Sequence, residues 1–152
     1  SLRGGTVPAT RRAAGRTPTR WGLHDYLDAN RFRTSYTRTM LSAIGSRAQL
    51  WLTETGGLVD RHNGSSTRIP QGMRHAANAT RFLFDRVRRV SPRIQRIYFY
   101  NWLANRPPAS WDSAFLNFRH GTRPSYRVLR DRLSRLARAG RLTGRLPATR
   151  AR

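Results

Sequence analysis

The sequence of 152 residues lacks cysteine and lysine, and Glu54 is its single glutamate. Without cysteine, the chain has no disulfide bonds and no thiolate metal sites. No apolar run reaches the roughly 18 residues that a membrane-spanning helix needs, and residues 1–20 hold no apolar signal segment. Hydrophobic residues make up 38% of the chain, so we expect a modest core for this length.

Acidic residues are scarce. The chain has seven acidic residues and 30 basic residues, all of them arginine, so its formal net charge is +23. One explanation is functional: a surface that binds nucleic acid or another polyanion. The other is genomic, because the GC-rich coding of some bacteria favours arginine codons over lysine codons. The absence of lysine favours the genomic explanation, since lysine also binds phosphate and a binding surface has no reason to exclude it.

Hydrophobic periodicity predicts alternating strands and helices between two arginine-rich ends. We expect a flexible arm over residues 1–19 and a disordered basic tail over residues 140–152. Between them, the pattern predicts strands over 21–26, 49–53 and 94–102 and helices over 35–45, 71–90 and 124–140.

This alternation predicts an α/β fold with a parallel sheet covered by helices. Three parallel strands are too few for a stable layer or a closed barrel, and an eight-strand barrel takes about 250 residues. We therefore interpret residues 20–139 as the C-terminal three β/α units, strands six to eight, of a (β/α)8 TIM barrel that is incomplete as given.

Side chains that could act in catalysis or bind a substrate lie at the ends of the expected strands. His24 and Tyr26 end the first strand, Glu54 follows the second, and Trp102 closes the third. In an α/β barrel the reacting groups project from these ends, so we expect them on one rim. A carboxylate can attack or stabilise an oxocarbenium-like centre, and a tyrosine hydroxyl can orient that carboxylate. The set indicates sugar chemistry, and the glycine pair after Glu54 is interpreted as leaving space for a substrate.

Side chains alternate between the two faces of a strand, so only some aromatic residues can reach the rim. Trp102 lies nearest the rim and is preferred over Tyr100 as the platform for a sugar ring. Trp51 and Phe99 are assigned to the core. The remaining histidines lack metal-ligand spacing and are expected at the surface: His62, His75 and His120.

Several segments, in order, resemble clan A glycoside hydrolases of the family 5 or family 39 kind, which are TIM barrels. WLTETGG, around Glu54, is similar to the seventh-strand segment that holds their nucleophile. WGLHDYLDANR is similar to the sixth-strand segment. IYFYNW, WDSAFLN and GTRPSYRVL are similar to the eighth strand, its loop and the final helix, so the resemblance covers roughly residues 20–137.

The resemblance implies a retaining glycosidase with Glu54 as its nucleophile. It implies that Tyr26 hydrogen-bonds Glu54, that His24 shapes the subsite at the cleavage point, and that Trp102 stacks beneath the sugar. Trp111 would line the substrate loop. The implied substrate is a β-linked glycan or glycoside, the implied full-length enzyme is secreted, and the reaction needs no metal or cofactor.

The acid/base residue that the resemblance implies has no counterpart in the sequence. The acid/base glutamate of the clan follows an asparagine after the fourth strand, and this chain has no second glutamate. A retaining mechanism needs two carboxyl groups about 5–5.5 Å apart. We therefore expect the C-terminal part of a longer enzyme, inactive by itself. Two alternatives stay open: a basic module that binds nucleic acid or acidic polysaccharide without catalysis, and a degenerate fragment without activity.

Overall fold

The structure, a computed structural model, describes residues 18–62 and 69–140. The expected arm and tail lie outside these residues apart from positions 18, 19 and 140. The elements, in chain order, are β1 (Arg20–His24), α2 (Tyr26–Arg31), α3 (Ser35–Ala43), β2 (Gln49–Thr55), β3 (Asp60–Arg61), α4 (Met73–Asp85), the 3-10 turn η1 (Val87–Arg89), β4 (Ile94–Phe99), β5 (Trp111–Asp112) and α5 (Pro124–Arg138).

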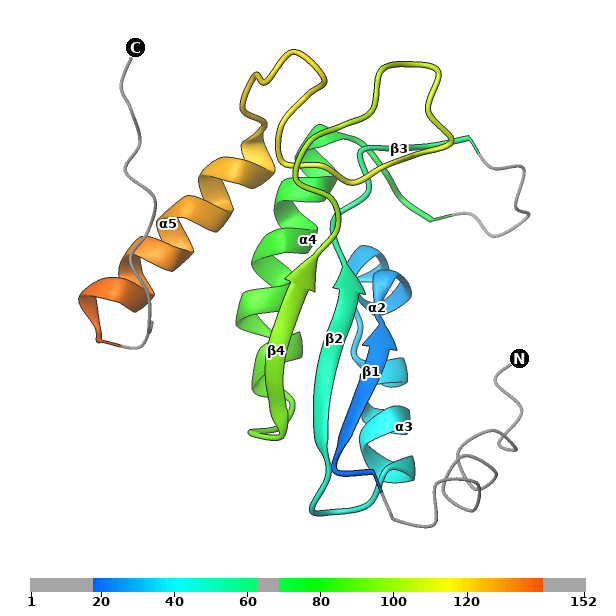
Figure 1. The fold of residues 1–152 in the computed structure, drawn as a ribbon, viewed down its shortest axis with the longest axis vertical. Helices are drawn as coiled ribbons and strands as arrows, with labels where there is room; N and C mark the ends of the chain where they lie inside the picture. The colour runs from blue at the N-terminus through cyan, green and yellow to red at the C-terminus, as the bar shows by residue number, and fades with distance from the viewer. Residues whose placement is uncertain (1–17, 63–68, 141–152) are drawn as a thin grey trace.

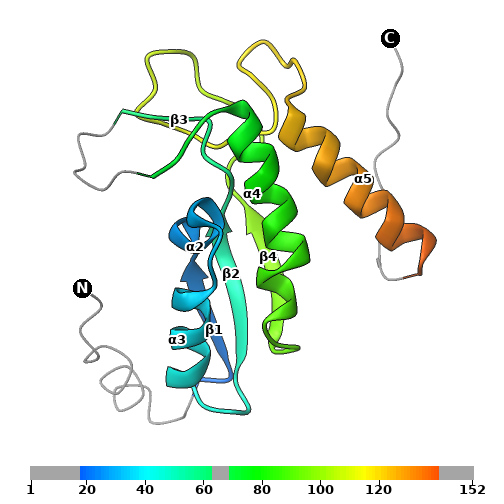
Figure 2. The ribbon, with the colours of Figure 1, turned by 180° about the vertical axis from the view of Figure 1, so that it is seen from behind.

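The centre of the fold is a parallel sheet with the strand order β1-β2-β4. Helices α2, α3 and α4 cover one face of this sheet, as Figure 2 shows from behind. The opposite face looks toward the viewer in Figure 1, and none of the helices that the structure describes lies over it. The predicted parallel sheet is thus confirmed. Its strands do not close on themselves, and their membership of a TIM barrel stays a prediction.

The core lies between the sheet and its covering helices. Leu50 and Leu52 of β2 are fully buried, and they pack with residues of α3, α4 and β4 such as Leu41, Leu83 and Ile94. Phe99 packs against this cluster, as predicted. These contacts follow from the period of two along each strand, which sends every second side chain to the helices.

Trp51 is a correction to the sequence analysis, which assigned it to the core. It stands between the inward-facing Leu50 and Leu52, so the pleat turns its ring to the opposite, uncovered face. There it contacts arginine side chains from both neighbouring strands. Leu50, Trp51 and Leu52 are all apolar, so the sequence does not show which of them face the helices. Trp51 was therefore assigned to the core with its neighbours.

Three elements at the rim of the sheet were not predicted: the helix α2 and the paired strands β3 and β5. The expected strand over 21–26 ends at His24, and Tyr26, expected at the end of that strand, instead begins the short helix α2. β3 pairs antiparallel with β5, so that Arg61 lies opposite Trp111. This pairing brings the long loop after β4 over the C-terminal ends of the parallel strands.

Candidate functional site

Glu54 stands near the C-terminal end of β2, where the pairing with both neighbouring strands becomes irregular. The Tyr26 hydroxyl donates a hydrogen bond to Oε1 of Glu54 at 2.9 Å. Nδ1 of His24 lies 3.6 Å from Oε2, too far for a good hydrogen bond. The Glu54 side chain is 32% exposed, so one carboxylate oxygen is held by tyrosine while solvent still reaches the group. The structure thus brings His24, Tyr26 and Glu54 together.

The protonation state of Tyr26 suits a donor. Burial, and then the hydrogen bond and charge of Glu54, raise the pKa of Tyr26 well above its usual range. The tyrosine therefore keeps its proton at neutral and moderately alkaline pH. It acts as a neutral group that orients the carboxylate.

Trp111 joins this cluster from the loop after β4. Its ring meets the ring of Tyr26 edge-on, with centroids 4.6 Å apart and an interplanar angle of 77°. Its indole Nε1 donates to Oγ of Ser113 at 3.1 Å, and that hydroxyl donates to the carbonyl of Tyr100. The loop, the end of β4 and the helix that begins at Tyr26 are therefore connected through Trp111.

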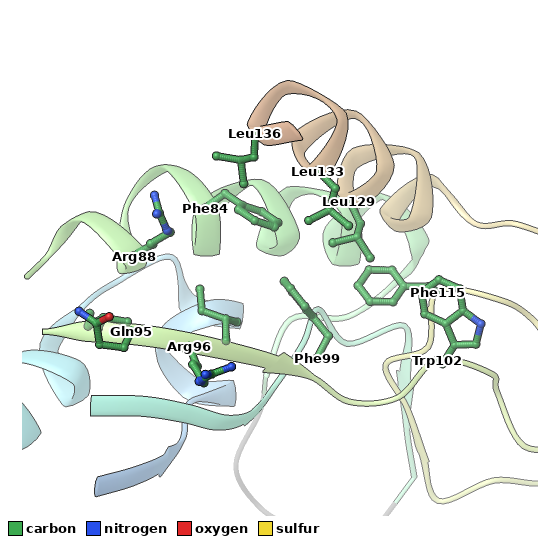
Figure 3. Close-up of a pocket in the computed structure, with 12 residues that line it drawn as sticks. Phe84, Arg88, Gln95, Arg96, Phe99, Trp102, Phe115, Leu129, Leu133 and Leu136 are labelled. Carbon is green, nitrogen blue, oxygen red and sulfur yellow. The ribbon is translucent and has the colours of Figure 1, made fainter. Parts of the chain in front are cut away.

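Trp102 lies elsewhere. Its ring packs on Phe115 and Tyr126, with centroids 5.9 Å and 5.8 Å away. It lines one end of a groove between β4 and α5, whereas Glu54 lies outside the lining of that groove (Figure 3). The structure shows no ring contact between Trp102 and Tyr26 or Trp111 within the described residues.

Tyr100 is the aromatic residue from the end of β4 that approaches the cluster. Its hydroxyl interacts electrostatically with that of Tyr26 and contributes to the raised pKa of Tyr26. Its backbone N–H donates to the carbonyl of Thr55 at 2.8 Å, beside Glu54. Alternation counted from the inward-facing Phe99 puts Tyr100 and Trp102 on the same face and so cannot separate them. β4 ends at Phe99, and the chain leaves the strand before it reaches Trp102.

The glycine pair after Glu54 packs against protein, which corrects the interpretation of an open space for substrate. Gly56 and Gly57 are both buried. A Cβ on Gly56 would lie 2.7 Å from the carbonyl oxygen of Tyr100, and one on Gly57 would lie 2.3 Å from that of Ala76. The two glycines thus let the chain leave β2 between β4 and α4.

Asn30, which the sequence analysis did not single out, ties the site together. It is completely buried, and its Nδ2 donates to the carbonyls of Tyr26 at 2.9 Å and Gly56 at 2.8 Å. Its Oδ1 accepts from the N–H of Leu58 at 2.7 Å and lies 3.1 Å from Nε2 of His75. Asn30 therefore joins the helix that begins at Tyr26 to the loop that follows Glu54.

Asp25 lies behind the same junction. Its N–H donates to the carbonyl of Glu54 at 2.9 Å, and its carbonyl accepts from Oγ1 of Thr55 at 3.1 Å. Its carboxyl group is buried and accepts from Oγ1 of Thr37 at 3.1 Å, while Oδ1 has no hydrogen-bond partner among the described residues. Burial, followed by the nearby charge of Asp28, raises the pKa of Asp25 to about 7.

Residues 18–62 and 69–140 contain no group of three side chains arranged to hold a metal ion. Within the same ranges, no helix has the length and apolar character needed to cross a bilayer. The side chains that meet at the site are one carboxylate, one neutral tyrosine, one histidine and the neighbouring aromatic rings.

No protein-family profile matches the sequence, and no curated protein matches it. Solved structures do share its fold. A β-glucuronidase of Ruminococcus gnavus aligns with a TM-score of 0.54 at 13% identity, over 76% of this chain and 22% of that chain. A Faecalibacterium prausnitzii β-glucuronidase aligns with a TM-score of 0.55 at 10% identity, over 80% and 22%.

A GH2 β-galacturonidase of Eisenbergiella tayi, bound to glycerol, aligns with a TM-score of 0.54 at 13% identity, over 86% of this chain and 24% of that chain. The chain thus spans less than a quarter of the length of these structures. All three are glycoside hydrolases, and at these identities the similarity concerns the fold. It gives no support to the narrower resemblance to families 5 and 39.

Proposed function

We propose that this chain is the C-terminal part of a retaining glycoside hydrolase and that Glu54 is its nucleophile. The observation that carries the proposal is the hydrogen bond from Tyr26 to Glu54 at the C-terminal end of a parallel strand. The fold shared with part of several glycoside hydrolases supports it. In this proposal β1, β2 and β4 are the last three strands of a TIM barrel.

The geometry suggests how Glu54 would act. Tyr26 holds Oε1, which leaves Oε2, on the side of His24, to attack the anomeric carbon. The C–O bond to the leaving group breaks as the bond to Oε2 forms, and a glycosyl ester of Glu54 results. The leaving oxygen takes a proton from a general acid. Water then cleaves the ester with that residue acting as a base.

The general acid would come from outside this chain. Glu54 is the only glutamate, and the nearest aspartate in sequence, Asp60, bonds to His62. The carboxyl groups of the other aspartates likewise bond to groups other than the Glu54 side chain. The complete enzyme is therefore needed for turnover, and the chain alone is expected to be inactive.

The substrate class follows from the enzymes that share the fold. Their names state activity on β-glucuronides and β-galacturonides. We take a β-linked glycoside of a sugar or uronic acid as the substrate, with aryl β-glucuronides as the first compounds to test. We take Tyr26, Trp111 and Tyr100 as the rings that border the bound sugar, because they lie around Glu54 or Tyr26.

The experiment compares the full-length protein with its Glu54→Gln variant on aryl β-glycosides. Loss of covalent catalysis is expected to lower turnover by roughly three orders of magnitude or more. An activated 2-deoxy-2-fluoro glycoside is expected to label Glu54, as peptide mass spectrometry would show. Asp131→Asn, at an exposed carboxylate on α5, is the control and should keep full turnover.

Wild-type turnover in Glu54→Gln would refute the assignment. The alternative of a noncatalytic basic module predicts a different result: no labelling, together with tight binding to a random oligonucleotide that weakens steeply with salt. No contact among residues 18–62 and 69–140 specifically favours that alternative.

A further inference from the structure

A buried polar group lies behind the contact between Tyr26 and Glu54. It consists of Asp25, Asp28 and Thr37, which we call the Asp–Thr–Asp group, and each of the three residues is at most 1% exposed. Oγ1 of Thr37 lies 3.1 Å from Oδ2 of Asp25 and 3.0 Å from Oδ2 of Asp28. A single hydroxyl therefore bridges two carboxyl groups that are shielded from solvent.

The bridging hydroxyl cannot satisfy two ionised carboxylates. A threonine has one O–H proton and an ionised carboxylate has none, so Oγ1 of Thr37 can donate to only one of its two neighbours. If both aspartates were ionised, the other one would face the lone pairs of Oγ1 in a buried place, which is strongly unfavourable. One aspartate therefore holds a proton and donates it to Thr37, while Thr37 donates its own proton to the other aspartate.

The hydrogen bonds of Asp28 identify it as the ionised member. Its Oδ2 also accepts from the N–H of Thr37 at 2.8 Å, and its Oδ1 accepts from the N–H of Tyr36 at 3.2 Å. Both amides belong to the first turn of α3, where a negative charge is favourable. Nε of Arg33 lies 3.7 Å from Oδ1. Oδ1 of Asp25, by contrast, has no hydrogen-bond partner among the described residues, so the proton belongs to Asp25.

The electrostatic environment of Asp25 agrees with this assignment. Burial, followed by the charge of Asp28, raises the pKa of Asp25 to about 7, against the opposite effect of hydrogen bonds from Thr37 and the backbone of Asp28. Charged or titratable side chains on the neighbouring segments engage other partners: His24 and Tyr26 with Glu54, Arg38 with Thr34, His75 with Asn30, and Arg33 with Asp28.

The backbone of Asp25 connects this group to the end of β2. The N–H of Asp25 donates to the carbonyl of Glu54 at 2.9 Å, and its carbonyl accepts from Oγ1 of Thr55 at 3.1 Å. The next residue, Tyr26, holds Oε1 of Glu54. A negative charge on Asp25 would be repelled by Asp28, and the start of α2 would then move relative to the end of β2. A displacement of about 1 Å near a reacting group can lower a rate about 100-fold.

We propose that Asp25 is a positioning residue for Glu54, which holds a proton, donates it to Thr37 and thereby keeps Tyr26 against the Glu54 carboxylate. When Asp25 releases this proton to solvent, the junction of α2 and β2 loosens and the attack of Glu54 slows. The proton is bound more tightly in the folded protein than in a free side chain, so the positioned state is present at low pH and is lost as pH rises through about 7. The inference rests on the proposed role of Glu54 as the nucleophile.

The test measures how fast Glu54 is labelled between about pH 6 and pH 9. Full-length protein reacts with the dinitrophenyl 2-deoxy-2-fluoro glycoside of the sugar that it hydrolyses, the β-glucuronide first. Dinitrophenolate leaves without a proton, so the titration of the general acid does not affect this rate. We expect the labelling rate of wild-type protein to fall about tenfold or more as pH rises through 7. Asp25→Asn should keep a constant rate, because its amide still donates to Thr37 and does not titrate.

Thr37 provides a second pair of variants. Thr37→Val removes both the acceptor for the Asp25 proton and the donor to Asp28, so labelling at pH 6 should slow about tenfold or more. Thr37→Ser keeps the hydroxyl and should restore the wild-type rate. Asp131→Asn, at an exposed carboxylate on α5, should keep the wild-type pH profile. The wild-type pH profile in Asp25→Asn, or the wild-type rate in Thr37→Val, would overturn the inference.

Infrared spectroscopy detects the proton on Asp25 without any measurement of activity. In full-length protein with isotope-labelled aspartate, the C=O stretch of a protonated carboxyl group should be present at pH 6 and disappear as pH rises. Asp25→Asn should lack this band. If wild-type protein lacks it as well, Asp25 holds no proton and the inference is wrong.

The outcomes separate this inference from the proposed function. Labelling of Glu54 with the same pH profile in wild-type protein and Asp25→Asn would refute the positioning role and support the nucleophile. A titrating Asp25 band in wild-type protein that is never labelled at Glu54 would refute the nucleophile, and with it the positioning role, although the proton itself would be confirmed.

Discussion

The hydroxyl of Tyr26 lies 2.9 Å from Oε1 of Glu54, although 28 positions separate the two residues in the chain. They meet because β1 and β2 run parallel and end at the same edge, where the N–H of Asp25 also bonds to the carbonyl of Glu54. This backbone bond holds the start of α2 against the end of β2. The side-chain contact at the proposed site therefore rests on the sheet itself.

The first prediction concerns Tyr26→Phe in the full-length enzyme. Removing the hydroxyl frees Oε1 of Glu54, and a hydrogen bond to a charged group contributes roughly 1.5–3 kcal/mol. We expect kcat to fall about 10- to 100-fold with a smaller change in KM. Steady-state kinetics measures both. Tyr36→Phe, on α3 and away from the site, is the control, and an unchanged kcat in Tyr26→Phe would remove Tyr26 from the mechanism.

The second prediction distinguishes two aromatic residues. The sequence analysis expects Trp102 beneath the sugar, whereas the structure places Tyr100 near Tyr26 and packs Trp102 on Phe115. We expect Tyr100→Ala to raise KM or lower kcat by about tenfold or more, since a sugar loses its ring contact. Trp102→Ala should mainly lower stability. Steady-state kinetics and thermal unfolding of both variants test this prediction. A kinetic defect in Trp102→Ala, with normal kinetics in Tyr100→Ala, would indicate that Trp102 is the sugar platform.

The third prediction is that Asn30→Ala loosens the loop after Glu54. The substitution leaves the N–H of Leu58 and the carbonyl of Gly56 without their partner in a buried place. Each unsatisfied group costs about 1–3 kcal/mol, so we expect a loss of roughly 2–5 kcal/mol in unfolding free energy. Hydrogen exchange at the amide of Leu58 should speed up in parallel. Asn78→Ala, at an exposed position on α4, should change stability by less than about 0.5 kcal/mol.

The fourth prediction concerns pH and Asp25. In the unfolded chain its carboxyl group has a pKa near 3.8, and in the folded protein burial raises that pKa to about 7. The folded state therefore binds the proton more tightly. The stabilisation is complete below about pH 4 and is lost as pH rises toward 7, at about 1.4 kcal/mol per pKa unit.

Asp25→Asn tests this linkage, because the amide resembles the protonated carboxyl group and does not titrate. Denaturant unfolding at pH 4.5 and pH 7.5 should show that wild-type protein loses more free energy of unfolding than the variant does. Equal losses in the two proteins would show that Asp25 does not hold a proton in the folded state. Asp131→Asn, at an exposed position, should follow the wild-type pH dependence.

Local patterns determined the main elements and the neighbourhood of the site. Branched and aromatic runs predicted β2 and β4, and helical spacing predicted α3, α4 and α5. Parallel strands end at a common edge, so strand order alone was enough to expect His24, Tyr26 and Glu54 near one another. Hydrophobic periodicity depends on residues that are close together in the chain, so it can be read directly from the sequence.

Only the tertiary structure decided which side chains share a face and which bonds hold them. Trp51 turned out to face away from the helices, and Tyr100 interacts with Tyr26 whereas Trp102 packs on Phe115 and Tyr126. Asn30 became the link between α2 and the loop after β2. These outcomes depend on register shifts and on hydrogen bonds between residues far apart in the chain. A one-residue shift in register reverses the face of every side chain beyond it, and no local pattern records that shift.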